Sequence, residues 1–359
     1  MFNILNAILV QTNSYIEFCQ KGLLIRGIQK SFSKPKITSL ITMFNSERFI
    51  KQAICSVQNQ NMADIEILII DDNSEDDSLK IAEQIQKSDK RIKVIRNKKN
   101  RGALYSKSLG ILKARGKYTM LLDSDDLFIN EELFDLCFNE GIKNNIDIIE
   151  FTGFLSYLDK FDITGKLPII PLYLRYKNHN DYVQQPQLSR FLYKHLDNTR
   201  YKLIDGFLTG KCIKTNIFRT TLKVIGKNVY NQKVNYGDDR LINFVLFKIS
   251  KSFKFIKQYG YIYKYNNVSI THSNNKTFNN CHDELINIEH IYKYTKFSND
   301  SDIVVFEILY RFKKIIKPGL NLDNWKYLYN LIMNLVNNTY ITNINKDKLL
   351  ALTNETQIT

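Results

Sequence analysis

Between residues 36 and 151, the apolar residues of this chain alternate between two spacings. Short runs rich in β-branched residues have the length and composition of buried strands, and the stretches between them place apolar residues on one face of a helix. The predicted strands are Ile37–Met43, Ile65–Ile70, Ile92–Ile95, Tyr118–Leu122 and Ile146–Phe151. Strands and helices that alternate at these lengths form right-handed βαβ units. The pattern therefore predicts an α/β fold, in which helices cover both faces of a mostly parallel sheet.

Several polar residues mark where the predicted helices begin. Ser46 is a candidate N-cap for the first helix. Ser74, with Asp77 three residues later, resembles a capping box for the second. Two further helices are predicted over 103–114 and 131–144. Each helix follows a predicted strand, so the loops between them lie at the carboxyl ends of the strands.

Three polar clusters follow three of the predicted strands. They are Thr42–Asn45, Asp71–Ser74 and Asp123–Asp126. Ligands of open α/β sheets bind beyond the carboxyl ends of the strands, so these clusters predict a binding site. The carboxylates of the third cluster repel one another unless a cation or hydrogen-bond donors compensate, and such oxygen ligands suit Mg2+ or Mn2+. An Asp-x-Asp spacing taken alone is more typical of a solvated turn, and it is the position beside two other polar clusters that favours a site.

The rest of the chain is less regular. Gly237-Asp238-Asp239 precedes a helical pattern, and helical periodicity returns in the Asn- and Lys-rich part of the chain after residue 266. We therefore expect a main domain over 36–265, with a ligand-binding half (36–150) and a second half (151–265), followed by a helical region over 266–359. Residues 1–35 would form an N-terminal extension, either packed on the domain or lying on a membrane as an amphipathic segment.

The composition narrows the choice of partner and compartment. The chain has 359 residues, a formal net charge of +15 and five cysteines without a Cys-x-x-Cys pair. The positive charge indicates an anionic partner such as phosphate, acidic glycan or anionic lipid. A nucleic-acid partner is not expected, because no basic run is interleaved with aromatic residues. Scattered cysteines and the absence of a run of ~20 apolar residues predict a cytoplasmic protein, with peripheral contact to the cytoplasmic face of an anionic membrane as an additional expectation.

A series of motifs resembles the family 2 glycosyltransferases of GT-A fold over residues 36–272. In chain order the motifs lie at Leu40–Asn45, Glu66–Ser74, Asn100–Gly110, Ala114–Asp125, Gly237–Asp239 and Tyr261–Thr271. Each motif is loose, but the order and spacing are specific. The resemblance implies a nucleotide-sugar donor, and the sequence departs from the family pattern at Thr42 (usually Pro), Asn73 (commonly Gly) and 106–108 (usually Ala-Arg-Asn).

The resemblance implies that Thr42, Phe44, Asn45 and Asp72 bind the nucleotide. Phe44 would offer an aromatic face to the base, and the Asp72 carboxylate would accept a hydrogen bond from the base or ribose. Taken alone, Phe44 is equally consistent with core packing and Asp72 with a turn. Lys107 would contact a phosphate, and its alternative is an exposed helix lysine.

The remaining roles also follow from the resemblance. Asp123 and Ser124 would lie at the donor's ribose and diphosphate, and Asp125, with Asp123 beside it, would bind Mn2+ or Mg2+. His272 is a further candidate ligand of the metal. Asp239 would be the general base that takes the proton of the acceptor hydroxyl.

Two neighbouring carboxylates have alternative interpretations. Asp238 would serve as a charge at a helix N-terminus, and Asp126 is expected to be structural.

The expected reaction is the inverting, metal-dependent transfer of one sugar from a UDP-sugar to a hydroxyl of a glycan or lipid-linked glycan. Transfer of a single sugar is favoured because the Gln-x-x-Arg-Trp sequence of processive synthases is absent. A nucleotidyltransferase of sugar phosphates is an alternative, although no Gly-rich phosphate loop follows the first strand. A basic, non-catalytic protein that binds glycan or nucleic acid on the same fold is a third reading.

Overall fold

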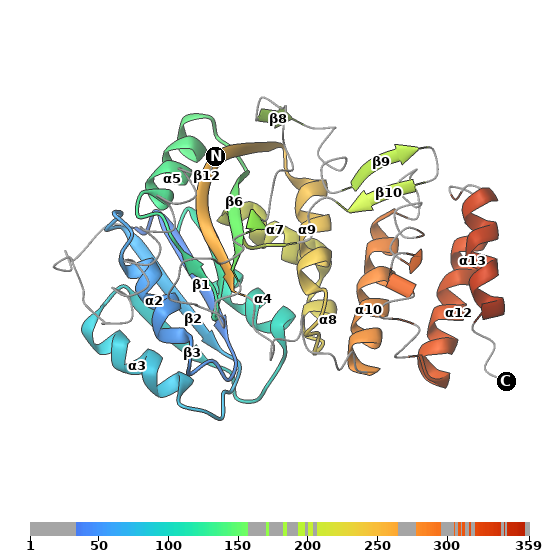
Figure 1. The fold of residues 1–359 in the computed structure, drawn as a ribbon, viewed down its shortest axis with the longest axis horizontal. Coiled ribbons are helices and arrows are strands. Elements are labelled where there is room, and N and C mark those ends of the chain that lie inside the picture. The colour runs from blue at the N-terminus through green and yellow to red at the C-terminus, as the bar shows by residue number, and fades with distance from the viewer. Residues whose placement is uncertain are drawn as a thin grey trace.

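A computed structural model describes most of the main domain and three C-terminal helices (Figure 1). The described residues are 34–156, 170–171, 182–184, 193–197, 200–203, 207–264, 278–295, 320–338 and 343–355, with single positions between 305 and 316 and at 341. The predicted N-terminal extension thus falls outside them except for its last two residues.

Ten strands form one sheet within the described residues, in the order β3-β2-β1-β4-β11-β6-β12-β5, with β7 beside β6 and β8 beside β12. A separate hairpin pairs β9 with β10. The strands are β1 (Ile37–Met43), β2 (Ile65–Asp71), β3 (Ile92–Arg96), β4 (Tyr118–Asp123), β5 (Leu127–Phe128), β6 (Ile148–Ser156), β7 (Ile170–Pro171), β8 (Tyr182–Gln184), β9 (Tyr193–Asp197), β10 (Arg200–Leu203), β11 (Lys211–Lys214) and β12 (Ser252–Lys264).

The sheet is parallel in its first half and mixed in its second. β3, β2, β1 and β4 are parallel neighbours, as the βα pattern predicts. β6 does not extend this series, because β11 inserts between β4 and β6 and is antiparallel to both. β12 is again parallel to β6. The α/β prediction is therefore confirmed, but "mostly parallel" applies to the first four strands.

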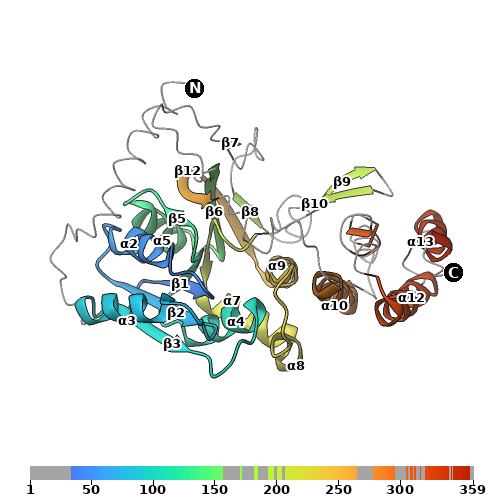
Figure 2. The same ribbon diagram turned by 60° about the horizontal axis from the view of Figure 1, so that its bottom comes forward.

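Helices cover both faces of the sheet (Figure 2). They are α2 (Ile50–Gln58), α3 (Ser78–Ser88), α4 (Ala103–Lys113), α5 (Leu133–Lys143), α7 (Thr215–Ile225), α8 (Lys227–Tyr230), α9 (Asp238–Ile249), α10 (Phe278–Thr295), α12 (Leu322–Val336) and α13 (Asn343–Glu355). In β1, Ile37 and Ile41 pack in the core with α2 and α5, whereas Leu40 packs in the core with α4, α7 and α9. This alternation decides which helices each strand residue meets.

Two helix starts differ from the prediction. α2 begins at Ile50, where the backbone oxygen of Ser46 accepts from the Ile50 N–H, but no side chain caps the helix. α3 begins at Ser78, four residues after Ser74, and the Ser74 hydroxyl accepts from the Asn45 N–H at 3.0 Å and does not cap the helix. Both predicted serine caps are therefore wrong: these serines stabilise the loops at the carboxyl edge of the sheet.

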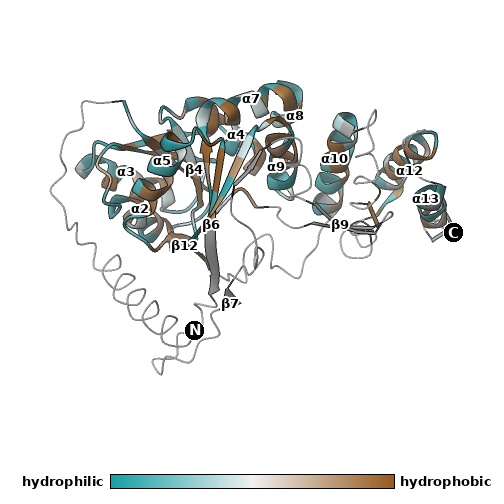
Figure 3. Ribbon diagram, turned by 90° about the horizontal axis from the view of Figure 1, so that it is seen from above, coloured by the Kyte–Doolittle hydropathy of each residue, from teal (hydrophilic) through white to brown (hydrophobic). Residues whose placement is uncertain are grey.

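The C-terminal helices α10, α12 and α13 extend the molecule beyond α9, away from the sheet (Figure 1). The predicted helical region is thus found, with α10 packed against α9 through a shared apolar core. Figure 3 shows hydrophobic residues along central strands such as β6 and a mixture of hydrophilic and hydrophobic residues along the helices. In the described part of the chain, no helix combines the length and apolar character that a membrane crossing requires.

Candidate active site

Residues far apart in the sequence meet at the carboxyl edge of β1 and β4. In β4, Thr119 contacts α7, and Leu121 packs in the core with α4 and α9. Asp123, two residues further, therefore faces the same layer. Thr42 of β1 is its register partner on the neighbouring strand. Asp239 belongs to the first turn of α9, and its electrostatic coupling to Asp123 indicates that the two carboxylates lie close together.

A lysine ammonium lies among these carboxylates. The Lys107 Nζ, from α4, is 2.5 Å from Asp239 Oδ1 and 2.9 Å from Asp238 Oδ2. The other oxygen of Asp239 accepts from the Leu208 backbone N–H at 3.1 Å. The Asp239 side chain is 17% exposed against 7% for Asp238, so Asp239 is the more accessible of the two. The phosphate contact of Lys107 stays a prediction, since its ammonium here binds carboxylates.

Burial and mutual repulsion dominate the electrostatics. Burial, followed by the neighbouring carboxylates, raises the pKa of Asp123 to about 7, although the Lys107 ammonium lowers it. Burial likewise raises the pKa of Asp238 to about 6 against the lowering effect of Lys107. Burial would lower the pKa of Lys107, but the carboxylates of Asp238, Asp239 and Asp123 outweigh burial and raise it well above its usual value.

The charges of this cluster leave an excess of negative charge. The Lys107 ammonium pairs with Asp238 and Asp239 and also acts electrostatically on Asp123, and Asp125 adds a fourth carboxylate at the end of β4. Two carboxylates that leave room for water and phosphates match the usual Mg2+ site. The metal-binding role of Asp123 and Asp125 stays a prediction, and the described residues contain no group of three or more His, Cys, Asp or Glu that could hold a metal ion. His272 lies outside the described residues.

The two aspartates after β2 bind different loops. Asp71 accepts from the Ser74 N–H and forms a 3.4 Å ion pair with Arg96. Asp72 is buried, and its carboxylate accepts from the Asn97 amide and from the backbone N–H groups of Arg101 and Gly102, at 2.7–2.8 Å. Asp72 therefore orders the loop that leads into α4, and its contact with a nucleotide stays a prediction.

Phe44, Asn45 and Ser124 lie around the same edge. Phe44 is 45% exposed, so the core-packing alternative for this residue is wrong. Asn45 has a φ of 49°, and its side-chain oxygen accepts from the Glu75 N–H. Ser124 is buried, with its hydroxyl 2.7 Å from that of Ser46. Their contacts with a donor are predictions.

Asp126 is structural, as predicted. Its buried carboxylate accepts from the Tyr261 hydroxyl and, at 2.8 Å, from the Lys264 N–H. Burial and the Asp125 and Asp123 carboxylates raise its pKa well above the usual value. Asp126 thus ties the end of β4 to β12.

Two features of the site had no signal in the sequence. The Leu208 N–H is a backbone donor, which residue identity does not reveal. The pairing of Lys107 with Asp238 and Asp239 joins residues more than 130 positions apart, and the sequence spacing gives no indication of it.

The match to a family model covers the strands and loops that carry Thr42, Asp72, Lys107 and Asp123. Residues 38–139 match the model described as glycosyl transferase family 2. This segment is a family 2 glycosyltransferase domain. The uncharacterized glycosyltransferase EpsJ of Bacillus subtilis is 28% identical over 237 residues, covering 66% of this chain and 63% of EpsJ. The GalNAc(5)-diNAcBac-PP-undecaprenol beta-1,3-glucosyltransferase of Campylobacter jejuni is 36% identical over 127 residues, covering 34% of this chain and 41% of the relative. The chain thus spans less than two thirds of either relative.

The family 2 domain and the elements after it also resemble solved structures. S. aureus TarS 1-349 in complex with UDP-GlcNAc superposes with a TM-score of 0.60 at 15% identity, covering 84% of this chain and 81% of the TarS 1-349 chain. At this identity the likeness concerns the fold. The expected GT-A type fold is confirmed.

Proposed function

We propose that this protein is a glycosyltransferase that moves one sugar from a nucleotide sugar to a hydroxyl of a glycan or lipid-linked glycan. The observation that carries the proposal is the position of Asp239. Its carboxylate is partly exposed, is held by Lys107 and the Leu208 N–H, and lies by the end of β4, where Asp123 and Asp125 are found. The family 2 domain supplies the donor-binding half.

Asp239 would act as the general base. A carboxylate offers about four lone-pair positions, and the contacts with Lys107 and Leu208 leave some of them open for an acceptor hydroxyl. As that oxygen attacks the anomeric carbon, Asp239 would take its proton, and the nucleoside diphosphate would leave from the opposite face, towards Asp123. Displacement from the opposite face inverts the anomeric configuration.

Asp125 and Asp123 would hold Mn2+ or Mg2+. When bound, the ion would neutralise charge on the departing diphosphate. The excess of carboxylates over the Lys107 ammonium supports a cation at this position, because burial and repulsion already raise the pKa of Asp123.

We propose a uridine diphosphate sugar as donor and a lipid-linked glycan as acceptor. Support for the donor is that TarS, of similar fold, was crystallised with UDP-GlcNAc, and that the exposed Phe44 ring adjoins the carboxyl end of β1. Support for the acceptor is the name of the Campylobacter jejuni relative, which contains an undecaprenol diphosphate.

Anionic membrane contact would bring the enzyme to such an acceptor. From Lys87 to Arg101, eight of the 15 residues are basic and one is acidic. Lys93 lies on the edge strand β3, and Lys98 and Lys99 follow it, all exposed. Lysines also protect edge strands from pairing, so the proposal needs its own test. Lys98→Glu/Lys99→Glu should weaken flotation with phosphatidylglycerol vesicles, while the double variant Lys113→Glu/Lys143→Glu, also at exposed positions, should not.

A nucleotide-sugar panel tests the proposed reaction. Each donor is added to the protein with Mn2+, and melting temperature and donor hydrolysis are measured. We expect one UDP-sugar to raise the melting temperature by mass action and to be hydrolysed slowly without acceptor. If no nucleotide sugar stabilises the protein or is consumed, the proposal fails. Binding of a nucleoside triphosphate together with a sugar phosphate would instead favour a nucleotidyltransferase.

A further inference from the structure

A short turn, residues 234–237, lies between α8 and α9 and directly precedes the helical turn that contains Asp239. On one side it binds the N-terminus of α4, where the Leu104 N–H donates to the Val234 oxygen at 3.0 Å. The Ala103 N–H donates to the Asn235 side-chain oxygen at 3.2 Å. The turn is therefore attached to the same helix that carries Lys107.

On its other side the turn binds α10, in the C-terminal helical region. One oxygen of Asp283 accepts from two successive backbone N–H groups, those of Asn235 at 2.9 Å and Tyr236 at 3.1 Å. The Asn287 amide, one helical turn further, donates to the Tyr236 oxygen at 2.9 Å. Asp283 is buried, so these bonds are shielded from water and cost more to lose than exposed ones.

The same face of α10 also fixes the start of α9. Glu284, fully buried, pairs with the buried guanidinium of Arg240, the residue after Asp239. Gly237 has a φ of 75°, and a Cβ there would lie 2.9 Å from the Asn287 amide and closer still to Arg240. The Arg240 and Asn287 side chains are therefore packed closely against the Gly237 backbone.

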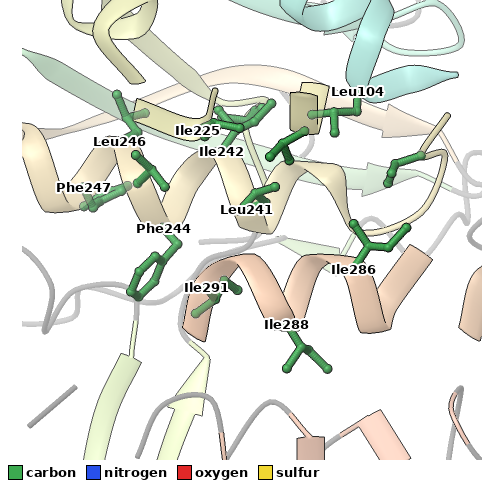
Figure 4. Close-up of a cluster of buried hydrophobic side chains, with 14 of the residues drawn as sticks. Leu104, Ile225, Leu241, Ile242, Phe244, Leu246, Phe247, Ile286, Ile288 and Ile291 are labelled. Carbon is green, nitrogen blue, oxygen red and sulfur yellow. The ribbon is translucent and has the colours of Figure 1, made fainter. Parts of the chain in front are cut away.

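Apolar side chains pack α10 against α9. Leu241 and Phe244 of α9 belong to one buried cluster with Ile286 and Ile291 of α10 (Figure 4). Leu104 of α4 belongs to the same cluster. The helices on either side of the turn are thus joined through a common core.

We infer that Asp283 is a positioning residue for Asp239, so that α10 completes the active site from outside the main domain. This inference rests on the proposed function. Asp283 would hold the turn so that the first turn of α9 keeps the Asp239 carboxylate within reach of the acceptor hydroxyl. A displacement of about 1 Å at such a group can lower the rate by about a hundredfold. The donor site, on β1 and β4, would be unaffected.

The experiment compares the full-length wild type with Asp283→Ala, Asp283→Asn and the control Glu289→Ala. Glu289 lies on α10 and forms an i,i+4 pair with Lys293, half of whose side chain is exposed. Three quantities are measured: hydrogen exchange of a peptide covering 232–241, donor affinity, and turnover per donor-binding site. For Asp283→Ala we expect faster exchange, donor affinity within about twofold and turnover lowered by about tenfold or more. Asp283→Asn keeps an acceptor oxygen and should recover most of the turnover, and Glu289→Ala should match the wild type.

Unchanged exchange in Asp283→Ala would overturn the contact, and faster exchange with turnover within twofold would overturn the positioning role. If Asp283→Ala does not fold, Asn287→Ala removes one bond to the same turn, and its turnover must fall without a loss of donor affinity. A wild type that consumes no nucleotide sugar would refute the proposed function, whereas the exchange comparison would still decide whether α10 holds the turn.

Discussion

Both ends of the parallel strands carry carboxylates and basic side chains, but the ratio of carboxylates to hydrogen-bond donors differs between them. At the amino edge, the Glu66 side chain is 1% exposed, and its oxygens accept from the Thr38 hydroxyl and from the Arg115 N–H and guanidinium, at 2.6–2.8 Å. Thr38 in turn accepts from the Gly116 N–H. At the carboxyl edge, one ammonium, that of Lys107, pairs with Asp238 and Asp239 and is the cation that also acts on Asp123.

The difference separates a structural cluster from a ligand site. A buried carboxylate that protein donors fully satisfy holds the chain in place and has no need of a ligand. Gly116 adds to this, because a Cβ there would lie 2.3 Å from the Thr38 nitrogen. A cluster with surplus negative charge is costly as it stands, and its cost falls when a cation binds. Both clusters belong to sequence motifs, so motif membership alone does not distinguish them.

The largest effect is expected from Asp239→Asn, which removes the proposed base while keeping the shape. Turnover of the donor should fall by about 10²- to 10⁴-fold, the usual contribution of a general base, with a small change in melting temperature. Steady-state rates with thermal denaturation measure both. Asp77→Asn, at an exposed position before α3, is the control. A loss of less than tenfold would mean that Asp239 is not the base.

At the amino edge, Glu66→Gln should lower the stability of the fold. Losing the charge that Arg115 and Thr38 surround should lower the free energy of unfolding by about 2–4 kcal/mol, with turnover per folded molecule unchanged. Urea titration gives the stability, and Glu83→Gln on the exposed side of α3 is the control. Full stability with lost turnover would contradict the structural assignment.

The sequence predicted what local periodicity controls. The bounds of β1 follow from one apolar run, and the βα alternation places Asp123 at the correct strand end. The predictions from sequence were wrong, or missing, where the structure of a segment depends on contacts with residues far away in the sequence. Ser74 had the signal of a capping box, yet its hydroxyl binds Asn45 from another loop. β11 is four residues long and lies between β4 and β6, which no local pattern indicates.

The site was predicted in part for the same reason. The resemblance located Asp123 and Asp239, but side-chain partners such as Lys107–Asp238 and backbone donors such as Leu208 depend on tertiary contacts. The effect of α10 on the turn before α9 could not be read from Asp283, which looks like any polar helix residue.

Stabilisation by Mn2+ should depend on the carboxyl edge and not on the amino edge. An ion at ten times its dissociation constant stabilises the folded state by about 1.4 kcal/mol. We expect this gain in the wild type and in Glu66→Gln, and a much smaller gain in Asp125→Ala. Urea titrations with and without Mn2+ measure it. An equal gain in Asp125→Ala would place the ion elsewhere.

At the amino edge, the contribution of Asp89 to the stability of the fold should depend on pH. Burial would raise the pKa of this carboxyl, but hydrogen bonds from the Arg91 and Gln58 side chains, and the Arg91 charge, outweigh burial and lower it below 3.8. A carboxyl with a lowered folded-state pKa stabilises the fold above its unfolded value, and that contribution is lost as the pH falls through the folded value. Asp89→Asn should therefore cost about 1 kcal/mol near pH 7, and its difference from the wild type should vanish in acid. Urea titrations from pH 7 down to pH 2.5 test this. A difference that grows as the pH falls would show that Asp89 is not held as the ionised partner of Arg91.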